Sequence, residues 1–200
     1  MTAKIAPERP TALDPEWEAL SAEIRACTRC RLHETRTQAV VYRGSLAPRV
    51  LFIGEAPGAA EDRDGRPFVG RSGKRLDAAI LALALAPEEF GVLNVVKCRP
   101  PGNRFDRVAE RTCRPYLDRQ IALLRPELLV TLGAHALRAL APDAPAVLDV
   151  AGSPLPGRSP PVFPLIHPAA AMRSRRWAQR WERDVVGLGA WLRARPAQPT

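Results

Sequence analysis

Four short apolar runs alternate with stretches of helical periodicity, and this alternation constrains the fold more than any other feature of the sequence. The runs cover residues 50–53, 92–96, 128–132 and 162–166. Between the first two, Leu76, Ile80 and Leu83 recur at helical spacing. Continuous apolar runs are typical of strands buried on both faces, and strands that alternate with helices imply a parallel sheet. The sequence therefore predicts an α/β fold of three layers, α/β/α, around a central, mainly parallel four-stranded sheet.

Helices are predicted on both sides of this alternation. Asp14 and Pro15 have the preferences of an N-cap and a first helical position, and the apolar stripe after them predicts a helix that ends near Cys27. A final amphipathic helix is predicted through Trp177 and Trp181, whose spacing favours a place in the core over stacking on bases.

The remaining segments define the expected domain. We expect residues 13–193 to form a single domain, with flexible ends at 1–12 and 194–200. The stretch 141–161 is rich in proline and glycine, which predicts a loop with a short strand at about 147–150.

The composition limits the expected location of the protein and its expected binding partners. The longest apolar run, 78–86, has nine residues, well short of the roughly 18 to 20 that span a bilayer. The N-terminus lacks the apolar stretch of a secretory signal, so we expect a cytoplasmic protein and no membrane partner. Thirty basic against twenty-one acidic residues give a net charge of +9. This favours a phosphate-rich partner, although an arginine-rich composition without such a partner fits equally well.

Chemically capable residues follow three of the predicted strands. The loop 54–58 leads to Glu61 and Phe68, Asn94 interrupts the second apolar run, and His167 follows the last one. Because ligands of parallel sheets bind beyond the carboxyl ends of the strands, we expect these side chains to converge on one crevice. The alternative for each is structural: a turn, an amide bonded to backbone, or a surface ring.

Four cysteines form a second candidate site. Cys27 and Cys30 have CxxC spacing, whereas Cys98 and Cys113 stand alone. A cytoplasmic chain keeps its thiols reduced, so metal ligation is favoured over disulfides. Four thiolates suit either zinc or an iron–sulfur cluster, and the spacing does not choose between them.

Several motifs together resemble one known family. The sequence contains GEAPGAAED at 54–62, GRPFVG at 65–70, NVVKCRPPGNR at 94–104 and HPAA at 167–170. In this order they resemble the family 4 uracil-DNA glycosylases of bacteria and archaea, over about residues 27–173. The resemblance implies excision of uracil from DNA, leaving an abasic site for base-excision repair. It also implies a structural [4Fe-4S] cluster, held by Cys27, Cys30, Cys98 and Cys113.

The resemblance also assigns roles around the crevice. The residues expected to bind uracil are Glu55, Ala56, Pro57, Gly58, Glu61, Phe68, Asn94 and His167. Asn94, His167 and Glu55 are expected to be catalytic. Asn94 offers one donor and one acceptor to O4 and N3–H of a flipped uracil, and His167 can donate to O2. Glu55 either stabilises the sugar cation, orients water or only packs. Phe68 is expected to stack on the base and Glu61 to lie near the position of a thymine methyl.

Contacts with DNA are expected beyond the histidine. Met172 is the best apolar wedge, because Ala170 and Ala171 stand where the family usually has bulky leucine or tyrosine. The basic residues that follow can hold phosphates or form only a solvated helix face; they are Arg173, Arg175, Arg176, Arg180 and Arg183.

Partners and competing functions complete the expectations. We expect uracil-containing DNA, single- or double-stranded, as the partner and a monomer as the active form. The alternative function is a nucleic-acid binding protein of the same fold, stabilised by a metal cluster, without excision activity. A zinc hydrolase is disfavoured because the three histidines are widely separated and no HExxH motif occurs.

Overall fold

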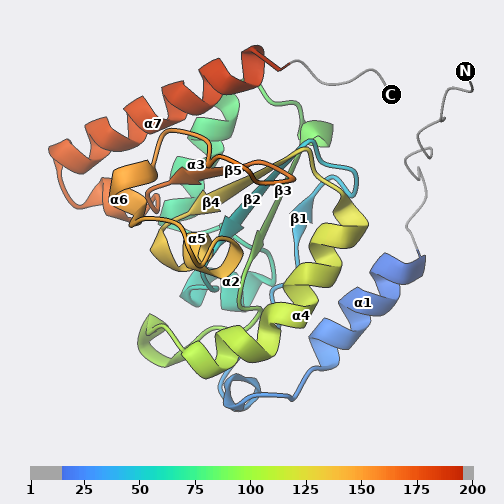
Figure 1. Cartoon of the computed structure of the whole chain (residues 1–200). Helices are drawn as coiled ribbons and strands as arrows, with labels where there is room; N and C mark the ends of the chain where they lie inside the picture. Colours follow the sequence, from blue (N-terminus) through green and yellow to red (C-terminus); the bar gives the residue numbers. More distant parts are fainter. Residues whose placement is uncertain (1–14, 196–200) are drawn as a thin grey trace, which may run out of the picture.

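A computed structural model describes residues 15–195 and shows a twisted sheet between two layers of helices (Figure 1). The strand order is β1-β3-β2-β4-β5, and all neighbours are parallel except β1 and β3. The five strands are β1 (Arg43–Gly44), β2 (Val50–Gly54), β3 (Phe90–Asn94), β4 (Leu128–Leu132) and β5 (Val162–Leu165).

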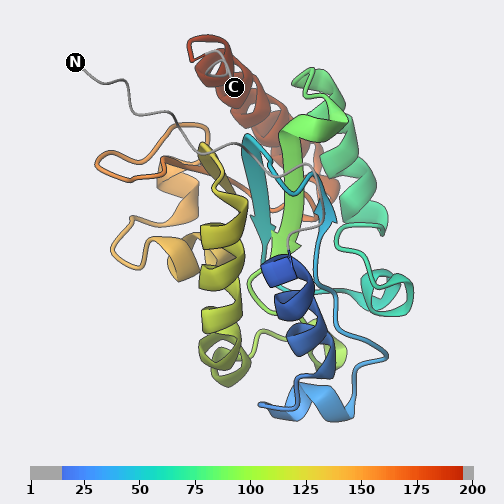
Figure 2. The same cartoon turned by 90° about the vertical axis from the view of Figure 1, so that its right-hand side faces the viewer.

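Helices cover both faces of this sheet, as the turned view makes clear (Figure 2). One face packs against α1, α4 and α5, and the opposite face against α3 and α7. The α-helices are α1 (Pro15–Ala26), α2 (Ala59–Asp64), α3 (Arg71–Ala82), α4 (Arg107–Leu124), α5 (Ala134–Leu140), α6 (Val147–Val150) and α7 (Arg175–Arg193). Short 3₁₀ turns are η1 (Arg31–Glu34), η2 (Pro87–Glu89), η3 (Pro101–Asn103) and η4 (Ala170–Met172). The predicted three-layer, mainly parallel α/β fold is confirmed.

Alternating side chains of the strands fill two separate cores. Leu51 and Ile53 of β2 point to the α1, α4 and α5 side, whereas Val50 and Phe52 point to the α3 and α7 side. All four are fully buried. Burial on both faces explains why these strands read as continuous apolar runs rather than alternating ones.

The sheet has five strands rather than the predicted four. The additional strand, β1, pairs antiparallel with β3 at only two positions, Arg43 with Val92 and Gly44 with Gly91. The two paired residues are an arginine and a glycine, and the apolar stretch 39–42 before them forms no strand, so no apolar run coincides with β1. The second strand was predicted at 92–96, but it begins and ends two residues earlier, at 90–94. The amides of Val95 and Val96 still donate to the carbonyls of Gly54 and Glu55, at the end of β2 and in the loop after it.

The prediction of a short strand at about 147–150 is wrong, since these residues form the helix α6. The amide of Ala151 bonds back to the carbonyl of Val147, at 2.9 Å. Leu148 is 47% exposed, so this valine-containing segment lies on the surface and lacks the buried neighbours that a strand needs.

Three expectations concern the chain ends. The N-cap Asp14, the segment 1–12 and most of the tail 194–200 lie outside the described residues. Among the residues that are described, no helix is long and apolar enough to cross a membrane.

Candidate active site

A cleft of about 760 Å³ opens at the carboxyl ends of the parallel strands. Its walls come from the loop after β2, the end of β3, the start of α5 and the turn after β5. It is lined by all eight residues expected to bind uracil: Glu55, Ala56, Pro57, Gly58, Glu61, Phe68, Asn94 and His167. The structure therefore brings the three predicted segments to one cavity.

Asn94 lies at the floor of this cleft, at the last position of β3. The residue is 1% exposed, and its Oδ1 has no hydrogen-bond partner among residues 15–195. A Cβ atom added to Gly54 would come within 2.5 Å of both Asn94 Oδ1 and Phe68 Cζ. Glycine at 54 therefore lets the amide and the aromatic ring meet above the end of β2.

The ring of Phe68 is held by an unusual backbone conformation. Phe68 has a φ of 55°, in the left-handed region that non-glycine residues rarely adopt. Glu61 braces this loop, since its Oε1 accepts from the amides of Val69 at 3.1 Å and Gly70 at 2.8 Å, and its Oε2 accepts from Gly58 at 3.1 Å. The carboxylate expected near a thymine methyl is thus already engaged with three backbone amides.

His167 faces Phe68 across the cleft, with ring centroids 5.9 Å apart. Its Nδ1 accepts a hydrogen bond from the amide of Ala169 at 3.1 Å, so the ring proton lies on Nε2. Burial lowers the pKa of His167 to about 4; nearby Arg173 lowers it further and Glu61 opposes the effect. The histidine is therefore a neutral donor at ordinary pH.

Glu55 lies on the loop after β2, with 29% of its side chain exposed. Burial raises the pKa of Glu55, and the like charge of Glu110 adds to the effect. His135 Nε2 lies 3.8 Å from Glu55 Oε2, and the His135 ring stacks on Phe105 with centroids 3.7 Å apart. Burial also lowers the pKa of His135. A carboxylate and an imidazole thus share one wall of the cleft.

His135 and its neighbours also line the cleft, although the sequence did not predict them as site residues. Gly133 and His135 follow β4 as directly as the loop 54–58 follows β2, and both line the cleft. The rule about strand ends, applied to 128–132, was the available signal. Ser72 and Asn103 also line the cleft, and they come from a helix and a 3₁₀ turn that the rule does not reach.

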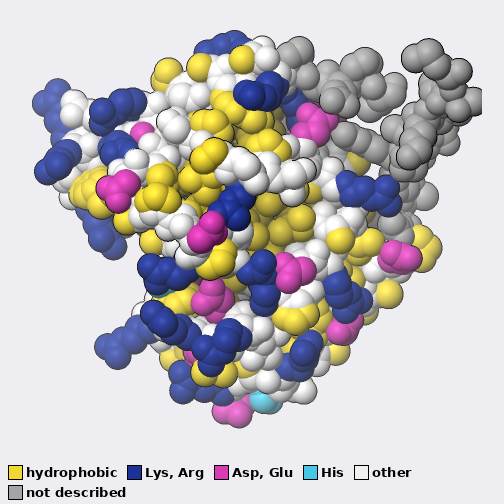
Figure 3. Space-filling model, in the orientation of Figure 1, with side chains coloured by type: hydrophobic (Ala, Val, Ile, Leu, Met, Phe, Trp, Pro, Cys, Tyr) yellow, Lys and Arg dark blue, Asp and Glu magenta, His cyan; other side chains and the backbone are white. Residues whose placement is uncertain are grey.

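Basic side chains border the cleft beyond His167. Arg173 lines it, Arg175 and Arg176 are exposed at the start of α7, and Met172 is 40% exposed. Figure 3 shows dark blue side chains gathered at the left edge of the molecule, where the N-terminal end of α7 lies. Arg180 is not free for phosphate, because its guanidinium pairs with Asp184 at 2.9 Å and bonds to the carbonyls of Leu148 and Ala151.

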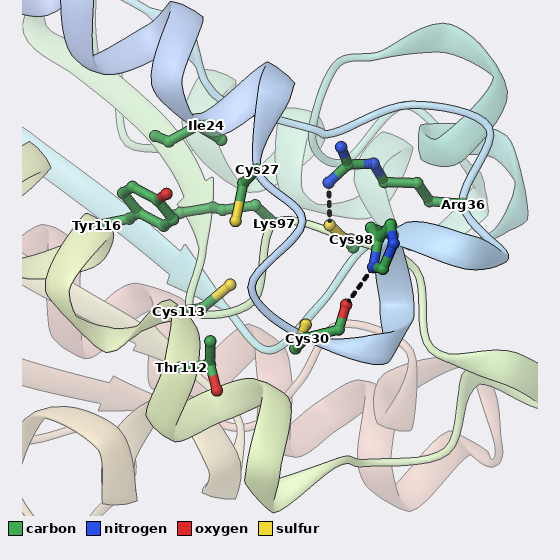
Figure 4. Close-up of a pocket in the computed structure, with 10 residues that line it drawn as sticks. Ile24, Cys27, Cys30, Arg36, Lys97, Cys98, Thr112, Cys113 and Tyr116 are labelled. Carbon is green, nitrogen blue, oxygen red and sulfur yellow. Dashed lines mark hydrogen bonds between the residues drawn. The ribbon is translucent and has the colours of Figure 1, made fainter.

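The four cysteines line a second cavity, on the α1 and α4 side of the sheet (Figure 4). Cys27 and Cys30 come from the chain after α1, Cys98 from the segment after β3, and Cys113 from α4. All four are free thiols. Within residues 15–195, no three histidine, cysteine or acidic side chains are grouped so that they could hold a metal ion.

Two basic side chains border the thiols. Arg36 donates to Cys98 Sγ at 2.9 Å, and Lys97 lines the same cavity. Burial raises the pKa of Cys98, whereas the bond from Arg36 opposes this. The bond from Arg36 suits a sulfur ligand that carries negative charge.

The start of α4 is tied to the CxxC loop. Arg31 donates to Asp106 through two nitrogens, at 3.0 and 2.9 Å, and Asp106 caps α4 by accepting from the amides of Val108 and Ala109. This contact holds the helix that carries Cys113 against the segment that carries Cys30.

The fold and the cleft define an α/β protein that can hold a small planar ligand between an amide, an aromatic ring and an imidazole. Comparison with protein families agrees. The model of the uracil DNA glycosylase superfamily matches residues 41–186. The chain therefore belongs to the uracil-DNA glycosylase superfamily, and several of its similar relatives are type-4 members, which confirms the resemblance.

Three relatives illustrate the similarity. A type-4 uracil-DNA glycosylase of Sulfurisphaera tokodaii is 38% identical, over 84% of this chain and 80% of its own length. Type-4 enzymes of Thermotoga maritima and Saccharolobus solfataricus are each 39% identical, covering 79% and 90% of this chain and 84% and 88% of their own lengths.

Proposed function

We propose that this chain is a uracil-DNA glycosylase that takes uracil out of the DNA stack and hydrolyses its N-glycosidic bond, leaving an abasic site. Family membership and the convergence of three motifs on one cleft support this proposal. A base inside a duplex is out of reach, so the enzyme must flip it into a pocket and read its edge there.

The observation that carries the proposal is the unpaired Oδ1 of Asn94. A buried acceptor without a partner costs roughly 1 to 3 kcal/mol, so its partner is expected to arrive with the ligand. In our proposal, Oδ1 accepts from N3–H of uracil while the amide nitrogen donates to O4. Cytosine presents the reverse pattern at these positions and leaves both groups unsatisfied.

The other walls of the cleft supply stacking and charge stabilisation. Phe68 supports the face of the base, and His167 donates through Nε2 to O2. As the C1′–N1 bond breaks, its electron pair passes to uracil and negative charge grows on O2. A neutral donor already fixed by Ala169 stabilises that charge without reorganising, which is typically worth a few kcal/mol.

In this proposal Glu55 acts on the sugar side. Its carboxylate can stabilise the positive charge that develops on the sugar, and it can orient the water whose oxygen forms the new bond to C1′. The raised pKa of Glu55 makes its carboxylate a stronger proton acceptor than an ordinary glutamate. Its ionised form is the one that both roles require.

We also propose that Cys27, Cys30, Cys98 and Cys113 hold a [4Fe-4S] cluster. In a single zinc site four sulfurs converge at about 2.3 Å on one ion. Within residues 15–195 no three of these thiols are grouped around a single ion position, and Arg36 donates to one sulfur, which fits a larger group of negative charge better. When bound, the cluster would supply structural support and no step of base removal.

DNA is held by the cleft border in this proposal. Arg173, Arg175 and Arg176 contact phosphates, and Met172 enters the space that the flipped base leaves. We propose that the enzyme acts as a monomer in the cytoplasm, on single- or double-stranded DNA, with residues 13–193 as one domain.

The test is excision from a uracil-containing oligonucleotide, followed by alkali to cut abasic sites. We expect cleavage at uracil with wild type, and rates lowered by about two to three orders of magnitude in Asn94→Ala and His167→Ala, with DNA affinity retained. Gln38→Ala, outside the cleft, serves as the control. DNA binding by iron-loaded wild type without cleavage would contradict the proposal and favour a binding protein of the same fold.

A further inference from the structure

Lys97 is a buried basic residue that the proposed function does not use. It is 1% exposed, although lysine is almost never fully buried unless it has a partner. It lies between the two sites, since its neighbour Cys98 lines the cysteine cavity and Asn94, three residues earlier, lines the cleft. Its contacts explain this position.

The side chain of Lys97 touches both sites. Its Nζ donates a hydrogen bond to the backbone carbonyl of Asn94. Its stem borders the cavity of the thiols, as Figure 4 shows. Because β1 pairs with β3 only at Gly91 and Val92, the carbonyl of Asn94 lies beyond the end of that pairing and takes this donor instead.

We propose that Lys97 is a positioning residue that couples the cysteine cavity to the base-reading amide of Asn94. This inference rests on the proposed role of Asn94. The amine has a proton to donate whether or not it is charged, so the link depends on its position rather than on its ionisation.

The consequence follows from how tightly the amide must be placed. Gly54, Phe68 and Asn94 are already in close approach, so a small rotation of the Asn94 peptide moves Oδ1 against the ring or away from the base. A misplacement of about 1 Å can cost about a hundredfold in rate. Residues 94–98 form one short stretch with Asn94 at one end and the thiol of Cys98 at the other. A displacement of Lys97 at the cavity is therefore passed to Asn94 through the bond from Nζ to its carbonyl.

The test uses Lys97→Met, which keeps the stem and removes the donor. With the iron-loaded protein, we expect the single-turnover excision rate to fall about tenfold or more, while iron content, the absorbance near 400 nm and the dissociation constant for DNA stay at wild-type values. In an Asn94→Ala background, Lys97→Met should add no further loss, because the two changes remove one function. Gln38→Ala, which lines neither the cleft nor the cysteine cavity, should excise at the wild-type rate.

Excision by Lys97→Met within about twofold of wild type, or an equal loss in the Asn94→Ala background, would overturn the inference. Where Lys97→Met does not fold, Lys97→Gln is the second test. Glutamine keeps a donor, but its side chain is shorter than that of lysine and does not reach the carbonyl of Asn94. Loss of fold or iron in both variants would overturn it as well, since Lys97 would then serve the cavity as a whole. A wild-type rate in Asn94→Ala contradicts the proposed function itself, whereas a normal Lys97→Met beside a slow Asn94→Ala contradicts only the coupling.

Discussion

The amide of Ala169 donates to Nδ1 of His167, two residues earlier, at 3.1 Å. This short local interaction fixes both the tautomer and the direction of the ring, since Nε2 is left as the only donor. Together with the lowered pKa of His167, to about 4, it makes the imidazole neutral over the whole physiological range.

The first prediction concerns pH. Because the folded pKa of His167 lies below its ordinary value, the active neutral form is complete above about pH 5 and is lost only as the pH falls through about 4. Single-turnover excision should therefore show no change attributable to His167 between about pH 6 and about pH 9. A step near pH 6.5 in wild type that disappears in His167→Gln would contradict a neutral donor.

The same shift has a consequence for stability. Below about pH 6.5 the unfolded chain takes up a proton on this histidine that the folded chain refuses until about pH 4. The free energy of unfolding should thus decrease as the pH falls through this window. Urea unfolding of wild type and His167→Asn at both ends of the window measures this change. An equal dependence of the free energy of unfolding on pH in the two proteins would contradict the prediction.

The second prediction concerns Glu61. In Glu61→Gln an amide NH₂ must face backbone N–H groups that now donate to the carboxylate, at Gly58 on one side or at Val69 and Gly70 on the other. We expect a decrease of about 1 to 3 kcal/mol in the free energy of unfolding and slower excision, because the loop that carries Phe68 is no longer braced. Urea unfolding and excision assays measure both.

Glu88→Gln is the matched control, since Glu88 is exposed on η2, away from the cleft. Equal stability of the Glu61→Gln and Glu88→Gln proteins would show that the bonds of Glu61 contribute little.

The third prediction concerns DNA affinity. Arg175→Ala combined with Arg176→Ala should weaken binding to all sequences alike and reduce the slope of log K against log salt by about one for each phosphate that the arginines no longer neutralise. Binding titrations over a range of salt concentrations give the slope. Arg119→Ala, on α4 and paired with Glu23, should leave the slope unchanged. An unchanged slope in the double variant would identify the start of α7 as a solvated face.

The fourth prediction concerns the cysteines. Cys98→Ser and Cys113→Ser should each purify with reduced iron and weaker absorbance near 400 nm, and should unfold at lower temperature. Iron analysis and thermal unfolding provide the measurements, with Thr112→Ser, at the same cavity, as the control. A colourless wild-type protein that contains zinc would rule out the cluster.

The sequence predicted the parts of this molecule that depend on local patterns. The runs at 50–53 and 128–132 marked their strands because both faces of those strands are buried. Asn94 was a candidate because it is polar inside an otherwise apolar run, although a purely structural amide fitted the sequence equally well. The strand-end rule then placed it, with Phe68 and His167, at one edge of the sheet.

What the sequence could not show depends on interactions between separate segments. Nothing near Glu61 indicates that its carboxylate binds amides eight and nine residues later, and nothing near Arg180 indicates its bonds to the carbonyls of Leu148 and Ala151 at the end of α6. The helix at 147–150 was misjudged for the related reason that valine favours strands only where neighbours cover it.

The cysteine cavity also sets an order of events during synthesis. Cys27 and Cys30 leave the ribosome early, but the wall formed by α4 exists only after residue 124 has emerged, and Asp106 must meet Arg31 before that helix is fastened at its start. A nascent chain that has not yet reached Cys98 has only the two thiols in CxxC spacing and no wall to close around them. In the proposal that these thiols hold a cluster, loading with iron is therefore a late step, which follows the assembly of the chain as far as α4.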